Sequence, residues 1–116
     1  MPKERTLFEK IISREIPATI IFENKRIIAF NDISPQAPVH ILIVPKKVIK
    51  SLNYINQEDA KLIGEMFLIA KNIAKSQGII DSGYRTIFNT NKDGGQTVYH
   101  LHLHLLGGRA LTWPPG

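Results

Sequence analysis

The segment His100-Leu101-His102-Leu103-His104-Leu105-Leu106 alternates imidazole and apolar side chains with a period of two residues. Successive side chains of a β-strand point to opposite faces of a sheet, so this period predicts a strand with histidines on one face and leucines on the other. The leucines can cover a core beneath a helix, which leaves the imidazoles facing a cleft or solvent. Because three of the four histidines stand in this segment, it is the first candidate for a functional site.

The sequence on either side predicts four further strands. The histidine strand is expected over residues 98–106, after a turn-rich loop at 91–95 and a strand at 85–89. Segments rich in β-branched and aromatic residues predict strands at 19–22 and 26–30, joined by a turn at 23–25. Another strand is expected at 40–44, after a proline-containing loop at 34–38 and before Pro45.

Two helices complete the prediction. Thr6 and Glu9 form a capping box before a short helix that ends at or before Ile16, because Pro17 follows. Asn56 can cap a long helix over residues 57–77, and Gly78 can end it. Its buried stripe is predicted to comprise Leu62, Ile63, Met66, Phe67, Ala70, Ile73 and Ala74. This order of elements predicts an α+β fold, a five-stranded, largely antiparallel sheet with one long and one short helix.

Composition limits the class of protein. The 116 residues are expected to form a single domain, 1–116, with a net charge of +5 and no cysteine, which excludes disulfides and thiolate chemistry. No apolar run approaches the ~18 residues of a membrane span, and the first residues lack a secretory signal, so we expect a cytoplasmic protein, with nuclear presence allowed. The basic residues are scattered without interleaved aromatics, and we therefore expect neither a nucleic-acid partner nor a membrane partner.

Three interpretations of the aligned histidines compete. The first is three satisfied surface or half-buried side chains. The second is a zinc site. The Cα atoms of His100 and His104 would lie about 13 Å apart, at ~3.3 Å per residue, which makes closure around one ion awkward. No Asp or Glu nearer in sequence than Asp93 could serve as a further ligand. The third is nucleophilic catalysis, with one imidazole attacking and its neighbours handling protons and charge. The preceding Gly94-Gly95-Gln96-Thr97 favours the third interpretation, because its backbone amides and its Gln96 and Thr97 donors suit phosphate oxygens.

The triad pattern, His-apolar-His-apolar-His followed by two apolar residues, resembles that of the histidine triad superfamily, in its nucleotide-binding Hint branch. The resemblance extends over nearly the whole chain. It includes Glu15-Ile16-Pro17-Ala18, the segment from Asp32 to His40, Pro45-Lys46-Lys47, the segment from Asp93 to His100, and Trp113-Pro114-Pro115-Gly116. The terminal motif points to this branch rather than to the dinucleoside-polyphosphate or galactose-1-phosphate branches.

The resemblance implies a purine nucleoside phosphoramidase that cleaves P–N bonds of AMP- or GMP-linked amines through a nucleotidyl-histidine. By position, His102 is the nucleophile, His104 lies near the phosphate and leaving group, His100 supports the site and His40 completes a tetrad. Asp32 matches the carboxylate that accepts the ribose hydroxyls, although turn chemistry alone also explains an aspartate there. The apolar walls of the purine slot match Phe8, Ile11, Phe30 and Ile33. The phosphate-side positions match Asn89, Gly95, Thr97 and Val98.

The resemblance also implies a homodimer with a continuous sheet, in which the terminal Trp113 segment lies at the twofold interface. The expected partners are purine ribonucleotides and a second copy of the chain, and no metal or other cofactor is expected. Dinucleoside polyphosphate hydrolysis is the runner-up within the enzyme class. A non-enzymatic nucleotide-binding or zinc-binding scaffold is the alternative outside it.

Overall fold

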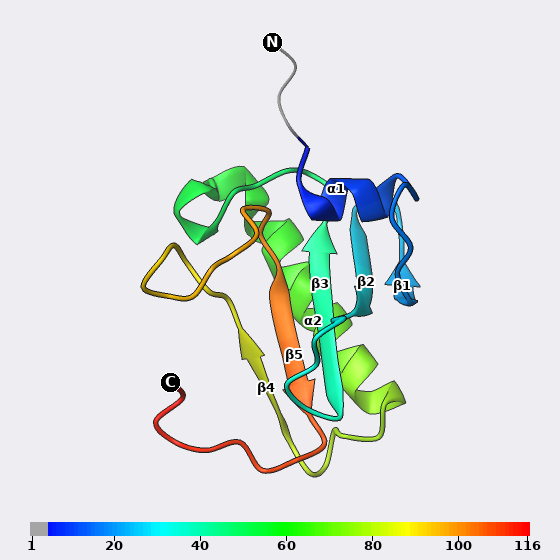
Figure 1. Ribbon diagram of the computed structural model, residues 1–116, viewed down its shortest axis with the longest axis vertical. Coiled ribbons are helices and arrows are strands. Elements are labelled where there is room, and N and C mark those ends of the chain that lie inside the picture. The colour runs from blue at the N-terminus through cyan, green and yellow to red at the C-terminus, as the bar shows by residue number, and fades with distance from the viewer. Residues whose placement is uncertain (1–4) are drawn as a thin grey trace.

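The computed structural model describes residues 5–116, which form a five-stranded antiparallel sheet in the order β1-β2-β3-β5-β4 (Figure 1). The strands are β1 (Ile20–Glu23), β2 (Ile27–Asn31), β3 (Val39–Pro45), β4 (Tyr84–Ile87) and β5 (Leu103–Gly107). The helices are α1 (Leu7–Ile12) and α2 (Ala60–Ser76), with short 3-10 turns η1 (Leu52–Tyr54) and η2 (Gln57–Asp59) before α2. The predicted fold class is confirmed. None of the helices within residues 5–116 has the length and apolar character needed to cross a membrane.

The central strand β3 is buried on both faces and divides the core in two. Ile41 and Ile43 belong to a core packed against α2, whereas Leu42 and Val44 belong to a second core beneath α1. The same alternation in β5 places Leu103 and Leu105 in the core against α2, as the sequence predicted. His104 pairs with Leu42 across the β3–β5 ladder and therefore lies on the α1 face.

Helix α1 begins as predicted and ends before Ile16, within the predicted limit. Thr6 Oγ1 accepts a hydrogen bond from Glu9 N at 3.1 Å, and Glu9 Oε1 accepts one from Thr6 N at 2.9 Å, which completes the capping box. The last helical residue is Ile12, because Arg14 adopts a left-handed backbone conformation with φ 67°. The sequence contains no glycine or proline at this position that would have revealed the break.

Helix α2 begins as the 3-10 turn η2, and its α-helical part starts at Ala60 rather than at residue 57. Gly78 follows it with φ +75°, as expected for a residue that ends a helix. One position of the predicted stripe was wrong, since Phe67 is 43% exposed and packs edge-on against Phe88. The prediction also omitted Ile69, which is buried in the core.

The strand predicted over residues 98–106 is much shorter, since β5 begins only at Leu103. Pairing of Ile43 with Leu103 would bring Leu101 opposite Pro45. Proline has no N–H to donate, so the ladder stops there. Leu101 N instead donates to Ile49 O at 2.6 Å. His100 and His102 therefore precede the strand, and only His104 lies within it.

Candidate active site

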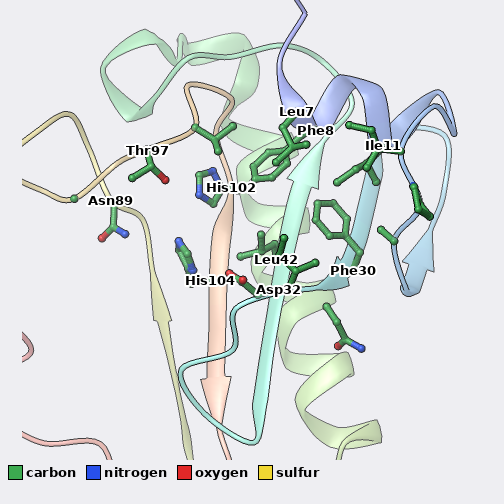
Figure 2. Close-up of a pocket in the computed structure, with 17 residues that line it drawn as sticks. Leu7, Phe8, Ile11, Phe30, Asp32, Leu42, Asn89, Thr97, His102 and His104 are labelled. Atoms are coloured by element: carbon green, nitrogen blue, oxygen red, sulfur yellow. The ribbon is translucent and has the colours of Figure 1, made fainter.

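A cavity of about 280 Å³ lies between α1, the end of β2, the middle of β3, and β5 with the segment before it (Figure 2). One end is apolar and is lined by Phe8, Ile11, Ile16, Pro17, Ala18, Phe30, Leu42 and Val98. The other end carries polar groups and is lined by Asp32, Asn89, Gly95, Thr97, His102 and His104. Leu7, Asn31 and Ile33 also contribute to the lining, and Ile33 is 89% exposed. The cavity therefore offers an apolar slot next to a set of hydrogen-bonding groups.

Phe8 joins the apolar slot to the histidines. The centroid of its ring lies 5.5 Å from the ring centroid of Phe30 and 4.8 Å from that of His102, and both contacts are edge-to-face. Such aromatic contacts hold a ring in a defined orientation. Helix α1 thus forms one wall of the slot and also packs against the imidazole that lines the polar end.

His100 is completely buried and does not line the cavity. Its Nε2 lies 2.7 Å from Pro45 O, which can only accept, so Nε2 carries the proton. Its Nδ1 lies 3.1 Å from Thr6 Oγ1, whose hydroxyl then donates to it. The prediction that all three imidazoles face a cleft or solvent is wrong for His100, because both of its ring nitrogens are occupied inside the protein.

His102 presents one free ring nitrogen. Its Nδ1 lies 2.7 Å from His100 O and must donate to that carbonyl, which leaves Nε2 unprotonated in the neutral ring. The side chain is 8% exposed and lines the cavity. An unprotonated nitrogen with a lone pair is the chemical requirement for nucleophilic attack. His102 therefore has the free lone pair that the role of nucleophile requires, and that role stays a prediction.

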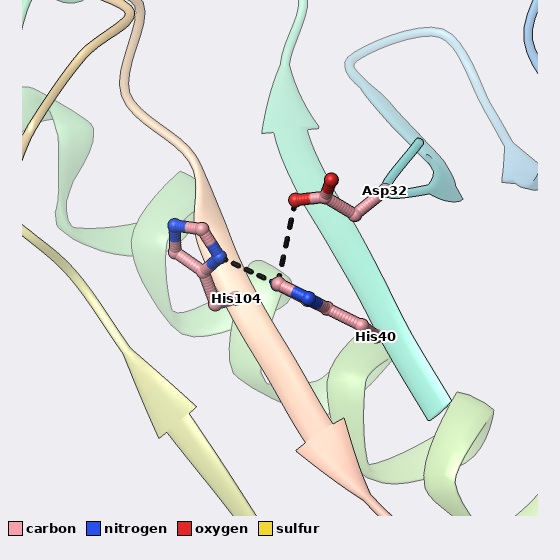
Figure 3. Close-up of side chains that lie close together, drawn as sticks. All are labelled: Asp32, His40 and His104. Atoms are coloured by element: carbon pink, nitrogen blue, oxygen red, sulfur yellow. Dashed lines mark hydrogen bonds and ion pairs between the residues drawn. The ribbon is translucent and has the colours of Figure 1, made fainter. Parts of the chain in front are cut away.

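His40 and His104 form a hydrogen-bonded pair next to Asp32 (Figure 3). Gln36 N donates to His40 Nδ1 at 3.0 Å, so the proton of the neutral ring sits on His40 Nε2. That N–H donates to His104 Nδ1 at 2.9 Å and lies 3.4 Å from Asp32 Oδ2. His104 must then carry its own proton on Nε2, at the opposite edge of a ring that lines the cavity. The site therefore contains an acceptor on His102 and a donor on His104.

All four imidazoles are neutral near pH 7. Burial lowers the pKa of His40, His100 and His102 below the ordinary value, and the nearby Asp32 carboxylate only partly offsets this for His40. Burial, with repulsion from His102 and His40, lowers the pKa of His104 to about 4. The lowered pKa values keep the lone pair of His102 available at neutral pH.

Asp32, His40 and His104 offer ligand atoms that all lie within 4.8 Å of one another, the spacing of a metal site. The sequence argument that no carboxylate stands near the triad was wrong, because the turn from β2 to β3 brings Asp32 there. A metal-bound histidine needs its lone pair on the metal and its other N–H donating to an acceptor. His40 shows the reverse arrangement, since its Nδ1 accepts from Gln36 N and its Nε2 bears the proton. These residues therefore fit a hydrogen-bonded relay better than a resident metal ion.

The loop before the triad lines the polar end through Gly95 and Thr97, as predicted, and Gly95 has φ +84°, a conformation that favours glycine. The predicted role of the Gln96 side chain needs correction. Its Nε2 donates to Lys50 O at 2.7 Å and to Val98 O at 3.2 Å, and its Oε1 accepts from Asn91 N at 2.9 Å. The Gln96 side chain is therefore occupied in holding the loop and has no donor free for a phosphate.

The structure brings most of the predicted residues to one cavity. Asp32 also makes the turn predicted for it, because its Oδ1 accepts from Ser34 N at 2.8 Å while its other oxygen approaches His40. Sequence reasoning missed Ile16, Pro17, Ala18, Asn31 and Leu42 in the lining. The period of β3 was a usable signal for Leu42, which lies two residues after His40 and on the same face. No signal in the sequence pointed to Asn31.

Comparison with known proteins gives consistent matches over nearly the full chain. A family model described as "Scavenger mRNA decapping enzyme C-term binding" matches residues 5–111. An uncharacterized HIT-like protein of Synechococcus elongatus is 55% identical over 97% of this chain and 98% of its own. The purine nucleoside phosphoramidase of Escherichia coli is 52% identical over 93% of this chain and 91% of its own. The crystal structure of a HIT family hydrolase from Legionella pneumophila matches with a TM-score of 0.95 and 54% identity, covering 97% of this chain and 100% of that one.

Proposed function

The chain belongs to the histidine triad (HIT) family of hydrolases, and we propose that it is a purine nucleoside phosphoramidase of the Hint branch. The observation that carries the proposal is the pair of ring nitrogens at the polar end of the cavity. His102 Nδ1 donates to His100 O, which leaves Nε2 as nucleophile, and His104 bears its proton on Nε2. The 52% identity to a purine nucleoside phosphoramidase supports the same activity.

In the proposed reaction the purine occupies the apolar slot between Phe8, Ile11 and Phe30, and Asp32 accepts the ribose hydroxyls. This placement brings the α-phosphorus to His102. Thr97, Asn89 and the backbone around Gly95 bind the phosphoryl oxygens, as donors at the polar end of the cavity. The apolar lining excludes water from the nucleobase, and the polar end orients the reacting bond.

His102 Nε2 attacks the α-phosphorus, and the P–N bond to the amine breaks as the new N–P bond forms. The positive charge that develops on the ring is stabilised by the Nδ1–H bond to His100 O. The amine leaves after taking a proton from a water molecule at the polar end of the cavity. The hydroxide formed in this way attacks the nucleotidyl-histidine, which releases the nucleoside monophosphate and regenerates neutral His102.

The test is a comparison of kcat/KM for an adenosine phosphoramidate, diadenosine polyphosphates and AMP esters. We expect the phosphoramidate to be the best substrate, because the amine leaves readily once protonated and no second nucleotide-binding element follows the loop. Equal or better turnover of a diadenosine polyphosphate would assign the protein to that class of hydrolase. No turnover of any of these substrates, with nucleotide binding retained, would indicate a binding or scaffolding role.

A further inference from the structure

Thr6 contacts both the base-binding helix and the triad. Its Oγ1 lies 3.1 Å from Glu9 N, which donates to it, and 3.1 Å from Nδ1 of His100. A hydroxyl can accept from one partner while its own proton goes to another. Since His100 Nε2 must donate to Pro45 O, His100 Nδ1 is an acceptor, and the hydroxyl proton of Thr6 is directed at it. One side chain thus caps α1 and holds a buried imidazole 94 residues later in the chain.

The His100 carbonyl, which holds His102 Nδ1, lies before β5 and outside the ladder with β3. Its peptide plane is held on one side by the Leu101 N bond to Ile49 O, and the bonds of the His100 ring hold the same residue from the α1 side. Within the described part of the chain, three hydrogen bonds thus hold residues 100–101 in place, one from Leu101 N and two at the His100 ring, with Thr6 Oγ1 and Pro45 O. With both of its nitrogens bonded, the His100 ring has a single tautomer and a single orientation.

We propose that Thr6 is a positioning residue for the nucleophile. Its hydroxyl fixes His100 from the α1 side, and His100 in turn presents the carbonyl that keeps the proton of His102 on Nδ1 and the lone pair on Nε2. Because α1 also carries Phe8 and Ile11, the same side chain couples the wall of the apolar slot to the geometry of the nucleophile. The effect on kcat rests on the proposed function, whereas the effect on the two imidazoles does not.

The test uses Thr6→Val, which keeps the shape of the side chain and removes the hydroxyl, and Thr6→Ser, which restores it. We expect Thr6→Val to lower kcat for an adenosine phosphoramidate by about ten- to a hundredfold, the scale of a misplaced reacting group, with a smaller change in KM. Thr6→Ser should recover most of the loss. In ¹⁵N-resolved NMR of the substrate-free protein, Thr6→Val should shift the His100 Nδ1 and His102 ring signals, and Thr6→Ser should not.

The matched control is Glu9→Ala, which removes the other half of the capping box and leaves the Thr6 hydroxyl in place. It should lower the unfolding temperature as Thr6→Val does, because both variants weaken the cap of α1. Its kcat should stay close to that of the parent protein, and its His100 Nδ1 signal should shift less than in Thr6→Val, because the Glu9 carboxylate acts on His100 through its charge and not through a hydrogen bond to the ring. If Glu9→Ala reduces kcat as much as Thr6→Val does, Thr6 acts only through helix stability and the proposal is overturned.

The NMR arm separates failure of this inference from failure of the proposed function. The parent protein could lack phosphoramidase activity and still show His100 and His102 signals that depend on the Thr6 hydroxyl. That result would reject the proposed substrate class and retain Thr6 as the positioning residue. Unchanged imidazole signals in Thr6→Val would overturn the inference even if the parent protein is an active phosphoramidase.

Discussion

His102 Nδ1 lies 2.7 Å from the carbonyl oxygen of His100, two residues before it in the chain. A carbonyl oxygen can only accept, so this contact assigns the proton of His102 to Nδ1 and the lone pair to Nε2. The contact exists because the backbone leaves the strand geometry before Leu103. In a regular strand, His100 and His102 would lie side by side on one face, and His102 would have no neighbouring carbonyl to hold its ring.

Replacing the nucleophile provides the first prediction. His102→Ala should lower turnover of an adenosine phosphoramidate by about a thousandfold or more, as for other removed nucleophiles. Its circular dichroism should match that of the parent protein, since the His102 ring lines a cavity. Rapid quench of the parent protein should trap one AMP on His102, as located by mass spectrometry of the peptides. An adduct on His100 or His104 would contradict the assignment.

The lowered pKa values of the imidazoles predict how activity depends on pH. Protonation of His102 removes its lone pair, and its pKa lies below 6.5, so the acid limb of kcat/KM should have its midpoint below pH 6.5. The profile should be flat from there to pH 8. The measurement is kcat/KM from pH 4.5 to 8.5 at constant ionic strength, and an acid limb centred at or above pH 6.5 would refute the prediction.

The same pKa values predict a loss of stability in acid. The unfolded chain binds protons to its histidines near pH 6.5, whereas folded His104 does so only near pH 4. Between these values the unfolded state holds more protons, so the free energy of unfolding should fall as the pH falls through this window. Urea unfolding at pH 7, 6 and 5 measures this change in the free energy of unfolding. His104→Asn should flatten this dependence relative to the parent protein.

Asp32 is expected to discriminate ribose from deoxyribose. Loss of a hydrogen bond to a charged group typically costs ~1.5–3 kcal/mol, so a 2′-deoxy phosphoramidate should have kcat/KM about ten- to a hundredfold below that of its ribo counterpart. Asp32→Asn should shrink this ratio, because the amide is a weaker acceptor. Asparagine can still form the turn to Ser34 N, so the loop is retained. A ratio unchanged by Asp32→Asn would place ribose recognition elsewhere.

The C-terminal segment provides a prediction about assembly. Trp113 is 81% exposed, and β4 forms an edge of the sheet with Tyr84 exposed on it and Phe67 exposed on α2. We expect a twofold dimer that continues the sheet and shelters these side chains. Sedimentation at micromolar concentration should show a dimer. Deletion of residues 112–116 should alter substrate selectivity more than the unfolding temperature, and a monomeric parent protein would contradict the prediction.

The Gln96 side chain is expected to matter for stability rather than for phosphate contact. Gln96→Ala removes three part-buried hydrogen bonds from the buried Gln96 side chain to the backbone of Asn91, Lys50 and Val98, which should cost about 1–3 kcal/mol in unfolding free energy. Gln77→Ala, at an exposed position after α2, is the control and should be nearly neutral. A Gln96→Ala protein of unchanged stability but greatly reduced phosphate affinity would restore the direct role first predicted for this residue.

The sequence by itself determined the sheet, its two helices and the chemistry of the site. The apolar runs rich in β-branched residues at 26–30 and 40–44 predicted strands, the alternation of histidine and leucine predicted the leucines of β5 on the core face, and the capping box at Thr6 predicted a helix start there. The imidazole pattern with its flanking glycines also predicted the cavity end that contains His102 and His104. These features depend on neighbours within a few residues, which a sequence displays directly.

Only the tertiary structure decided which groups of the site are hydrogen-bonded to one another. It buries His100 between Thr6 and Pro45 O, brings Asp32 and His40 to His104, and occupies Gln96 with backbone partners. These contacts join residues far apart in the chain, and the sequence holds no record of which donor meets which acceptor. The proton positions on the four imidazoles follow from these contacts together with two local ones, from Gln36 N to His40 Nδ1 and from His102 Nδ1 to His100 O, because a neutral ring carries its proton on the nitrogen that faces an acceptor.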